Sequence, residues 1–249
     1  MIGHYGLYDY DITTIKKLGH ITRVSNLKAV RCSGLECEIH RSKKNTINDS
    51  KLENNISRAK TKVKELVLCN EWNYFCTFTI SKEKYNRYDF KTYYEKFSKF
   101  IGNYNRSCLP DEKVKYIFVP EMHKDGAWHI HGFIKGIRKK DIYINGHGYL
   151  GWTQYEEKFG FISFSDIRDI DKSANYILKY ITKDTTKNIS ALGMHIYYAS
   201  KGLETAEIIY KGKILLKCPW GYETKDGYCR IKEFDGRYQD YKDYIEVMK

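Results

Sequence analysis

The chain has 249 residues, of which 42% are apolar, and its formal net charge is +12 at pH 7. This composition excludes a disordered chain, and no apolar run approaches the ~20 residues that cross a bilayer, so no membrane association is expected. The positive charge favours polyanionic partners, nucleic acid first, and the 23 tyrosines suit either stacking on bases or a β-sheet surface.

Residues 1–50 carry turn residues and lysines with little periodicity, so we expect little regular structure there. The first 20 residues lack a basic segment followed by an apolar one, which indicates no secretion signal and a cytoplasmic location. Residues 50–69 predict an amphipathic helix with Ser50 as its N-cap. Later expected elements are a strand over 73–81, a helix over 89–105, strands over 113–123, 127–136, 141–145 and 161–164, a helix over 171–184, and strands within 194–200 and 213–218.

Hairpin-forming strands with helices between them predict an α+β fold, in which helices pack on a central antiparallel sheet. We expect a basic N-terminal extension with its helix over 1–69, a core over 70–185, and a C-terminal extension over 186–249 that packs on the core. The sequence contains no G-x-x-x-x-G-K-[ST] phosphate loop, which excludes an ATP-driven motor.

The seven cysteines are an odd number and do not indicate a disulfide framework. Cys32, Cys37, Cys218 and Cys229 are the alternative set for a four-thiolate zinc site. They lack the tight C-x2-C spacing that is typical of such sites, so the spacing does not favour this alternative.

Two histidines lie on one face of the strand predicted over 127–136. His129 and His131 are two residues apart and share a face with Phe133, whereas Trp128 and Ile130 point to the opposite, apolar side. The alternative is that they are core histidines satisfied by hydrogen bonds. Because two imidazoles at this spacing are presented to one point away from the most apolar side, the pattern favours metal ligands.

A carboxylate on the preceding strand depends on the turn between the strands. A two-residue loop would place Glu121 opposite Ile130 on the apolar face, whereas a three-residue loop over 124–126 places it opposite His129. Gly126 suits the left-handed residue that ends such a three-residue turn. We therefore predict a positive φ at Gly126 and a Glu121 that faces His129.

Glu121, His129 and His131 thus form a candidate metal site with open positions. Mixed nitrogen and oxygen ligation of this kind suits Mn²⁺ or Mg²⁺ when the substrate is a phosphate. His123 lies on the same face near the turn. It is either a fourth ligand or a solvated loop histidine, and the sequence favours the second interpretation.

The helix predicted over 171–184 carries two tyrosines on one face, Tyr176 and Tyr180, each followed three residues later by a lysine, Lys179 and Lys183. An ordinary amphipathic helix with boundary tyrosines is the alternative. Beside a metal site, a tyrosine could act as a nucleophile while an ammonium stabilises the developing charge. Its buried stripe is expected to be Ala174, Ile177, Leu178 and Ile181.

Three segments in this order resemble the HUH endonuclease family of rolling-circle replication initiators from phages, plasmids and single-stranded DNA viruses. They are FCTFT at 75–79, HIH at 129–131 and YILKYITK at 176–183, and the resemblance covers residues 70–185. The glutamate eight residues before the first histidine is similar to geminivirus initiators, and the doubled tyrosine to those of small single-stranded DNA phages. The resemblance implies a ferredoxin-like or RRM-like palm for the central sheet.

The resemblance also implies a mechanism. A divalent metal on Glu121, His129 and His131 grips the scissile phosphate of single-stranded origin DNA. Tyr180, which matches the motif better than Tyr176, attacks and leaves a 5′-phosphotyrosine and a free 3′-OH. A host polymerase would extend this end in the bacterial cytoplasm, a host helicase would unwind the duplex, and the second tyrosine would rejoin the strand.

Two other functions remain open from the sequence. A transposase or relaxase would use related chemistry on mobile DNA. A non-catalytic single-stranded nucleic-acid-binding module would explain the charge and the tyrosines, but not the convergence of a glutamate with two histidines. A cupin-type enzyme is disfavoured, because the glutamate expected shortly after the histidine pair is absent.

Overall fold

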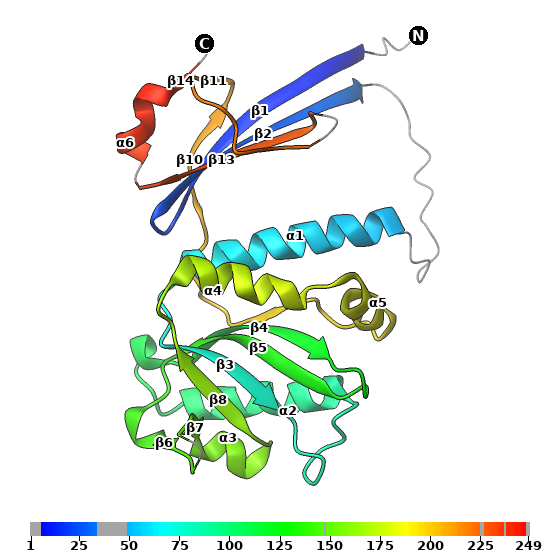
Figure 1. The fold of residues 1–249 in the computed structure, drawn as a ribbon, viewed down its shortest axis with the longest axis vertical. Helices are drawn as coiled ribbons and strands as arrows, with labels where there is room; N and C mark the ends of the chain where they lie inside the picture. The colour runs from blue at the N-terminus through cyan, green and yellow to red at the C-terminus, as the bar shows by residue number, and fades with distance from the viewer. Residues whose placement is uncertain (1–5, 34–48, 147, 225–226, 237, 248–249) are drawn as a thin grey trace. The chain divides into compact units, whose positions relative to one another are not determined.

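The computed structural model describes residues 6–33, 49–146, 148–224, 227–236 and 238–247 (Figure 1). The chain divides into two compact units, residues 45–204 and residues 1–44 with 205–249. The unit boundaries do not coincide with the boundaries expected after residues 69 and 185. The expected α+β class, with helices on antiparallel sheets, is confirmed. Among the described helices, none combines the length and apolar character needed to span a bilayer.

The sheet of residues 45–204 has the strand order β6-β7-β8-β3-β5-β4-β9, and every neighbouring pair is antiparallel. The strands are β3 (Tyr74–Thr79), β4 (Lys115–Met122), β5 (Trp128–Lys135), β6 (Ile142–Ile144), β7 (Leu150–Trp152), β8 (Ile162–Asp166) and β9 (Tyr198–Ala199). The helices are α1 (Asp49–Leu68), α2 (Phe90–Asn105), α3 (Thr153–Lys158), α4 (Ile170–Ile177) and α5 (Lys183–Ala191). Helix α1 begins one residue before Ser50, so the N-cap predicted there is wrong.

The β4–β5 hairpin has the predicted register. Glu121 pairs with His129, and Gly126 has φ = +84°. The amide of His123 donates to the carbonyl of Ala127 at 2.9 Å, and the amide of Gly126 donates to the carbonyl of His123 at 2.9 Å. Because these bonds close a three-residue loop, the glutamate lies on the histidine face, as the turn chemistry predicted.

One face of the sheet packs on α2 and α3 and forms an aromatic core. Phe78 of β3 contacts Phe97 of α2 and Tyr155 of α3, with ring centroids 5.7 and 4.8 Å apart. Phe118 of β4 and Trp128 of β5 belong to the same buried cluster. Aromatic pairs of this kind each add about 0.5–1.5 kcal/mol beyond burial, so this face supplies the rigid support for β5.

The other face of the sheet lies under α1, α4 and α5, which form the layer drawn above it in Figure 1. Ile117, Val119 and Phe133 are buried on this face at 1% exposure or less. Helix α1 contributes the predicted stripe, of which Ala59 and Val63 are buried, and α1 contacts both β4 and α4. The histidine face is therefore covered by helices along much of its length.

The expected continuous helix over 171–184 is wrong, because the segment is broken. Helix α4 ends at Ile177, a 3-10 turn follows over Leu178–Tyr180, and α5 begins at Lys183. Thr182 is extended and accepts a hydrogen bond from the amide of Thr185, which makes it the N-cap of α5. The cap offers the backbone an alternative to helix continuation, and Ile181 remains buried at 1% exposure.

Gly132 lies between His131 and Phe133 at a point where β4 and β5 approach closely. A Cβ here would collide with the carbonyl oxygen of Ile117 and would lie 2.5 Å from the Phe118 ring. We expect Gly132→Ala to lower the free energy of unfolding by about 1–3 kcal/mol, measured by urea denaturation. Gly102→Ala on α2 is the control, since a Cβ there meets nothing within 4 Å. It should leave stability equal or raise it by up to ~1 kcal/mol, and an equal loss in both variants would contradict the explanation.

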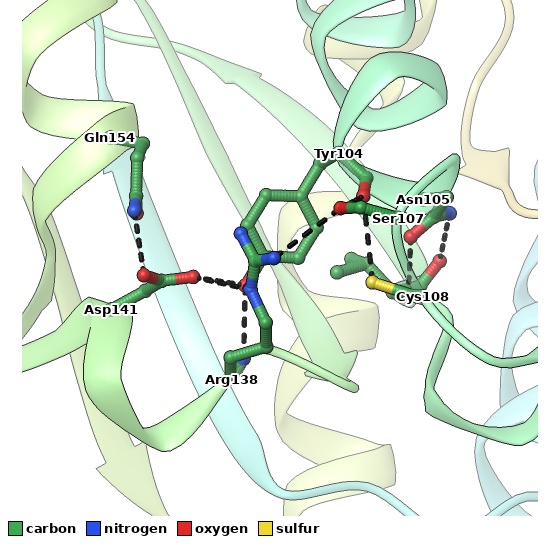
Figure 2. Close-up of polar contacts among 8 residues, drawn as sticks. Tyr104, Asn105, Ser107, Cys108, Arg138, Asp141 and Gln154 are labelled. Atoms are coloured by element: carbon green, nitrogen blue, oxygen red, sulfur yellow. Dashed lines mark hydrogen bonds and ion pairs between the residues drawn. The ribbon is translucent and has the colours of Figure 1, made fainter.

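A buried carboxylate fixes the chain after β5 (Figure 2). Asp141 accepts hydrogen bonds from Tyr104 at 2.6 Å, from Arg138 at 2.8 Å and from Gln154 at 2.7 Å. Burial alone would raise the pKa of Asp141, but these three bonds together lower it. The network lies at the end of β5 opposite to the histidines, and its satisfied bonds indicate a structural role.

Residues 6–33 and 205–249 form a second antiparallel sheet, with the order β10-β1-β2-β13-β12. Its elements are β1 (Gly6–Leu18), β2 (Ile21–Ser33), β10 (Glu207–Gly212), β12 (Tyr222–Glu223) and β13 (Cys229–Asp235), beside β11 (Ile214–Leu216), α6 (Tyr238–Tyr241) and β14 (Ile245–Val247). The expectation of little regular structure before residue 50 is wrong. Buried polar residues such as Thr13, Thr22 and Asn26 obscure the alternation of these strands, because hydrogen bonds satisfy them inside the fold. Cys37, of the alternative zinc set, lies outside the described residues.

Candidate active site

The candidate site lies on the helix-covered face of β3, β5 and β4, where three cross-strand rows change from apolar to polar. Direct pairing on both sides of β5 places members of each row side by side. The rows are Phe75–Phe133–Ile117, then Thr77–His131–Val119, then Thr79–His129–Glu121. The strand alternation therefore brings the two histidines and the glutamate to one polar edge of an otherwise apolar face.

His131 is held between a carboxylate and a hydroxyl. Its Nε2 donates to Glu121 Oε2 at 2.8 Å, and its Nδ1 lies 3.2 Å from Thr77 Oγ1. The His131 side chain is 9% exposed and that of Glu121 is 32% exposed. Because a hydroxyl both donates and accepts, Thr77 can serve either tautomer of the ring, including the one that would present Nε2 to a cation.

His129 has a different environment. Its Nδ1 lies 3.5 Å from Thr79 Oγ1, and its ring stacks on that of His123 with centroids 3.7 Å apart. His123 Nε2 lies 3.6 Å from Glu121 Oε2, so this loop histidine also borders the site. Glu121 is opposite His129 in the backbone register, but its carboxylate bonds to His131.

Both site histidines are held in the neutral form at pH 7. Burial, with His123 and His131 nearby, lowers the pKa of His129 to about 4. Burial also lowers the pKa of His131, against the opposing effect of the Glu121 carboxylate. Neutral imidazoles are the form that binds metals, so no proton has to leave these rings at neutral pH.

The donor chemistry fits a divalent ion, with two neutral imidazoles and a carboxylate on one polar edge. The described side chains do not close around a single point, and no group of three or more His, Cys, Asp or Glu in the described part of the chain forms a ready metal cluster. Glu121 and His131 meet directly, whereas the ring of His129 is stacked on His123. Glu121 and His131 are therefore the pair that the structure brings together most closely.

Tyr180 lies directly on this pair. Its ring is parallel to that of His131, at 3° and with centroids 3.7 Å apart. Its hydroxyl donates to the hydroxyl of Tyr176 at 3.0 Å. Burial, this hydrogen bond and the charge of Glu121 all raise the pKa of Tyr180. Tyr176 is 44% exposed and packs its ring against the edge of Phe75.

The two predicted lysines lie in different places. Lys179 Nζ is 4.7 Å from the centroid of the Tyr176 ring, which is a cation–π contact. Lys183 Nζ forms an ion pair with Glu53 Oε1 of α1 at 3.1 Å. The break after Tyr180 thus separates Lys183 from the simple i, i+3 placement that a continuous helix would give it.

Sequence reasoning assigned no role to Thr77 and Thr79, which contact the Nδ1 atoms of His131 and His129. The signal was present, because the two threonines have the same two-residue spacing as the histidines. It also missed the stacking partner role of His123.

The comparison with family models matches residues 73–185 to a family of replication-associated proteins of the ORF2 type. The matched range contains every candidate site residue, from Glu121 to Lys183. Neither the comparison with curated proteins nor that with solved structures gave a match. Residues 73–185 therefore carry a replication-associated domain of the ORF2 type, which confirms the resemblance to replication initiators of the phage and plasmid type.

Proposed function

We propose that this protein initiates rolling-circle replication by nicking single-stranded origin DNA with a tyrosine nucleophile. The observation that carries the proposal is the parallel stacking of Tyr180 on His131, whose ring is bonded to Glu121. A phenol beside a carboxylate–imidazole pair at the edge of a basic, replication-associated domain joins a nucleophile to a phosphate-binding position.

In the proposed step, the phenol oxygen of Tyr180 attacks the scissile phosphorus. The new bond is a phosphotyrosine on the 5′ side, and the bond that breaks releases the 3′ oxygen, which gains a proton and becomes a free 3′-OH. The phenol proton passes toward Tyr176, which accepts the hydrogen bond of Tyr180 and is 44% exposed to solvent. Protons therefore balance without any further cofactor.

Glu121, His129 and His131 would hold Mn²⁺ or Mg²⁺, which supplies Lewis-acid polarisation of a phosphate oxygen when bound. Thr77 and Thr79 fix the orientation of the two imidazoles through their Nδ1 atoms. Glu121 without a cation raises the pKa of Tyr180, so compensation of this carboxylate would favour ionisation of the phenol.

The second tyrosine suits the second half of a replication cycle. We assign Tyr176 to the cut of the regenerated origin and to the rejoining of the strand. Lys179 lies over its ring and can stabilise charge that develops near it. The free 3′-OH would be extended by a host polymerase, with a host helicase for unwinding, in the bacterial cytoplasm.

The test is cleavage of single-stranded oligonucleotides from the replicon that encodes the protein, with Mn²⁺ or Mg²⁺. A 3′-labelled oligonucleotide should move with the protein on a denaturing gel, and a 5′-labelled one should give a short product that a polymerase extends. EDTA should abolish both products. Cleavage that leaves a free 5′-phosphate would instead indicate hydrolysis by water, and binding without cleavage would favour a non-catalytic module.

A further inference from the structure

An open basic pocket of about 470 Å³ lies between α1 and the chain on either side of Tyr180. Helix α1 presents Glu53, Ile56, Ser57, Lys60 and Thr61, whose spacing of i, i+3, i+4, i+7 and i+8 is one helix face. The opposite wall is Lys179 and the stretch 181–183. All of these residues belong to the unit of residues 45–204, in which α1 contacts α4 and α5 (Figure 1).

The pocket has the chemistry of a phosphate site. Lys60, Lys179 and Lys183 line it, against one carboxylate, Glu53. Hydroxyl groups of Ser57 and Thr61 come from the same face of α1 and are donors suited to phosphate oxygens. The predicted apolar stripe of α1 uses other positions, such as Ala59 and Val63, so this polar face is not required for the core.

One lysine connects the pocket to the tyrosines. Lys179 lines the pocket, and its Nζ lies 4.7 Å from the centroid of the Tyr176 ring. A strand whose cleaved phosphate lies at the tyrosines therefore passes this lysine when it continues toward α1. We propose that the pocket binds a backbone phosphate of single-stranded DNA that flanks the cleaved one. This inference rests on the proposed function and extends its substrate contacts to α1, outside residues 73–185.

Glu53 makes the inference sharper, because it pairs with Lys183 at 3.1 Å. A phosphate that enters the pocket competes with this carboxylate for the ammonium and meets its negative charge. Removal of the Glu53 charge should therefore strengthen DNA binding, whereas removal of a lysine charge should weaken it. Two substitutions in one pocket thus have expected effects of opposite sign.

The experiment uses the full chain with Tyr176→Phe and Tyr180→Phe, in EDTA, so that binding is measured without cleavage. The affinity for a fluorescein-labelled single-stranded oligonucleotide is measured by anisotropy over a range of salt concentrations. Lys60→Gln should weaken binding by roughly three- to tenfold and reduce the slope of log affinity against log salt by about 0.7. Glu53→Gln should tighten binding by roughly two- to threefold.

Lys99→Gln is the matched control, because Lys99 is exposed on α2, on the other face of the sheet (Figure 1). It removes the same charge and should leave both the affinity and the slope near those of the parent chain. Equal losses in Lys60→Gln and Lys99→Gln, or no tightening in Glu53→Gln, would overturn the proposal. The same titration with a poly-glutamate peptide is included, since a loss confined to the peptide would assign the pocket to an acidic protein segment.

The result is independent of the chemistry. Adduct formation by the wild-type chain tests the proposed function, and equilibrium binding by the double phenylalanine chain tests the pocket. Normal adduct formation with unchanged binding by Lys60→Gln would overturn only the pocket. A salt-dependent loss at Lys60 without any adduct in the wild-type chain would overturn only the proposed function.

Discussion

Tyr180→Phe is expected to slow formation of the covalent 5′ adduct by at least ~10³-fold, and the double variant with Tyr176→Phe is expected to form none. Phenylalanine keeps the ring that stacks on His131 and removes only the hydroxyl. The loss therefore reports the nucleophile and not the packing. The measurement is the rate at which a 3′-labelled single-stranded oligonucleotide becomes attached to the protein, followed on denaturing gels under single-turnover conditions.

Tyr176→Phe should have a different effect. It removes the acceptor of the Tyr180 hydrogen bond, so the first cut should slow by about tenfold, because solvent can still take the proton. Strand joining, which needs a second nucleophile, should be lost. The two defects are separated by a substrate with one cleavage site and a substrate with two.

Tyr149→Phe is the control for both variants, since Tyr149 is 55% exposed between β6 and β7 and belongs to no part of the site. It should cut and join as the wild-type chain does. If each single variant still forms adducts at the wild-type rate and only the double variant fails, the two tyrosines are interchangeable and the assigned order is wrong. Adducts in the double variant would remove both tyrosines from the chemistry.

The part of the site that lies on strands could be predicted from the sequence, because local rules determine it. Strand alternation places His129 and His131 on one face, and the turn that Gly126 permits sets Glu121 opposite His129. Each rule depends on only a few neighbouring residues. The strand alternation and the turn therefore both survive in the folded protein.

The part that depends on tertiary packing could not be predicted. The 171–184 segment has a helical pattern throughout, yet it breaks at Ile181 because Thr182 caps a new helix. The break changes the position of Lys183, which pairs with Glu53 from a segment about 130 residues away in sequence. The β1–β2 hairpin was missed for a related reason, since buried threonines interrupt the apolar alternation and their partners lie far along the chain.

The metal site gives the second large prediction. Glu121→Ala and His131→Ala are each expected to raise the dissociation constant for Mn²⁺ by more than ~100-fold, and to abolish adduct formation, because each removes a proposed ligand. His129→Ala should behave in the same way if its imidazole is the third ligand. Mn²⁺ binding is followed by the loss of the free-ion EPR signal, which does not depend on DNA or on cleavage. Thermal unfolding of each variant checks that the fold is intact.

Two further substitutions decide whether the loss is specific. Thr77→Val keeps the shape of the side chain but removes the hydroxyl beside His131 Nδ1, so Mn²⁺ affinity should fall by ~10–100-fold while the ligands remain. His123→Ala should cost less than about tenfold if His123 is a loop histidine that only stacks on His129. A loss at His123 as large as that at His131 would make it a ligand in place of His129. Mn²⁺ binding that is unchanged in Glu121→Ala would contradict the carboxylate–imidazole site, because Glu121 is the one proposed ligand already bonded to His131.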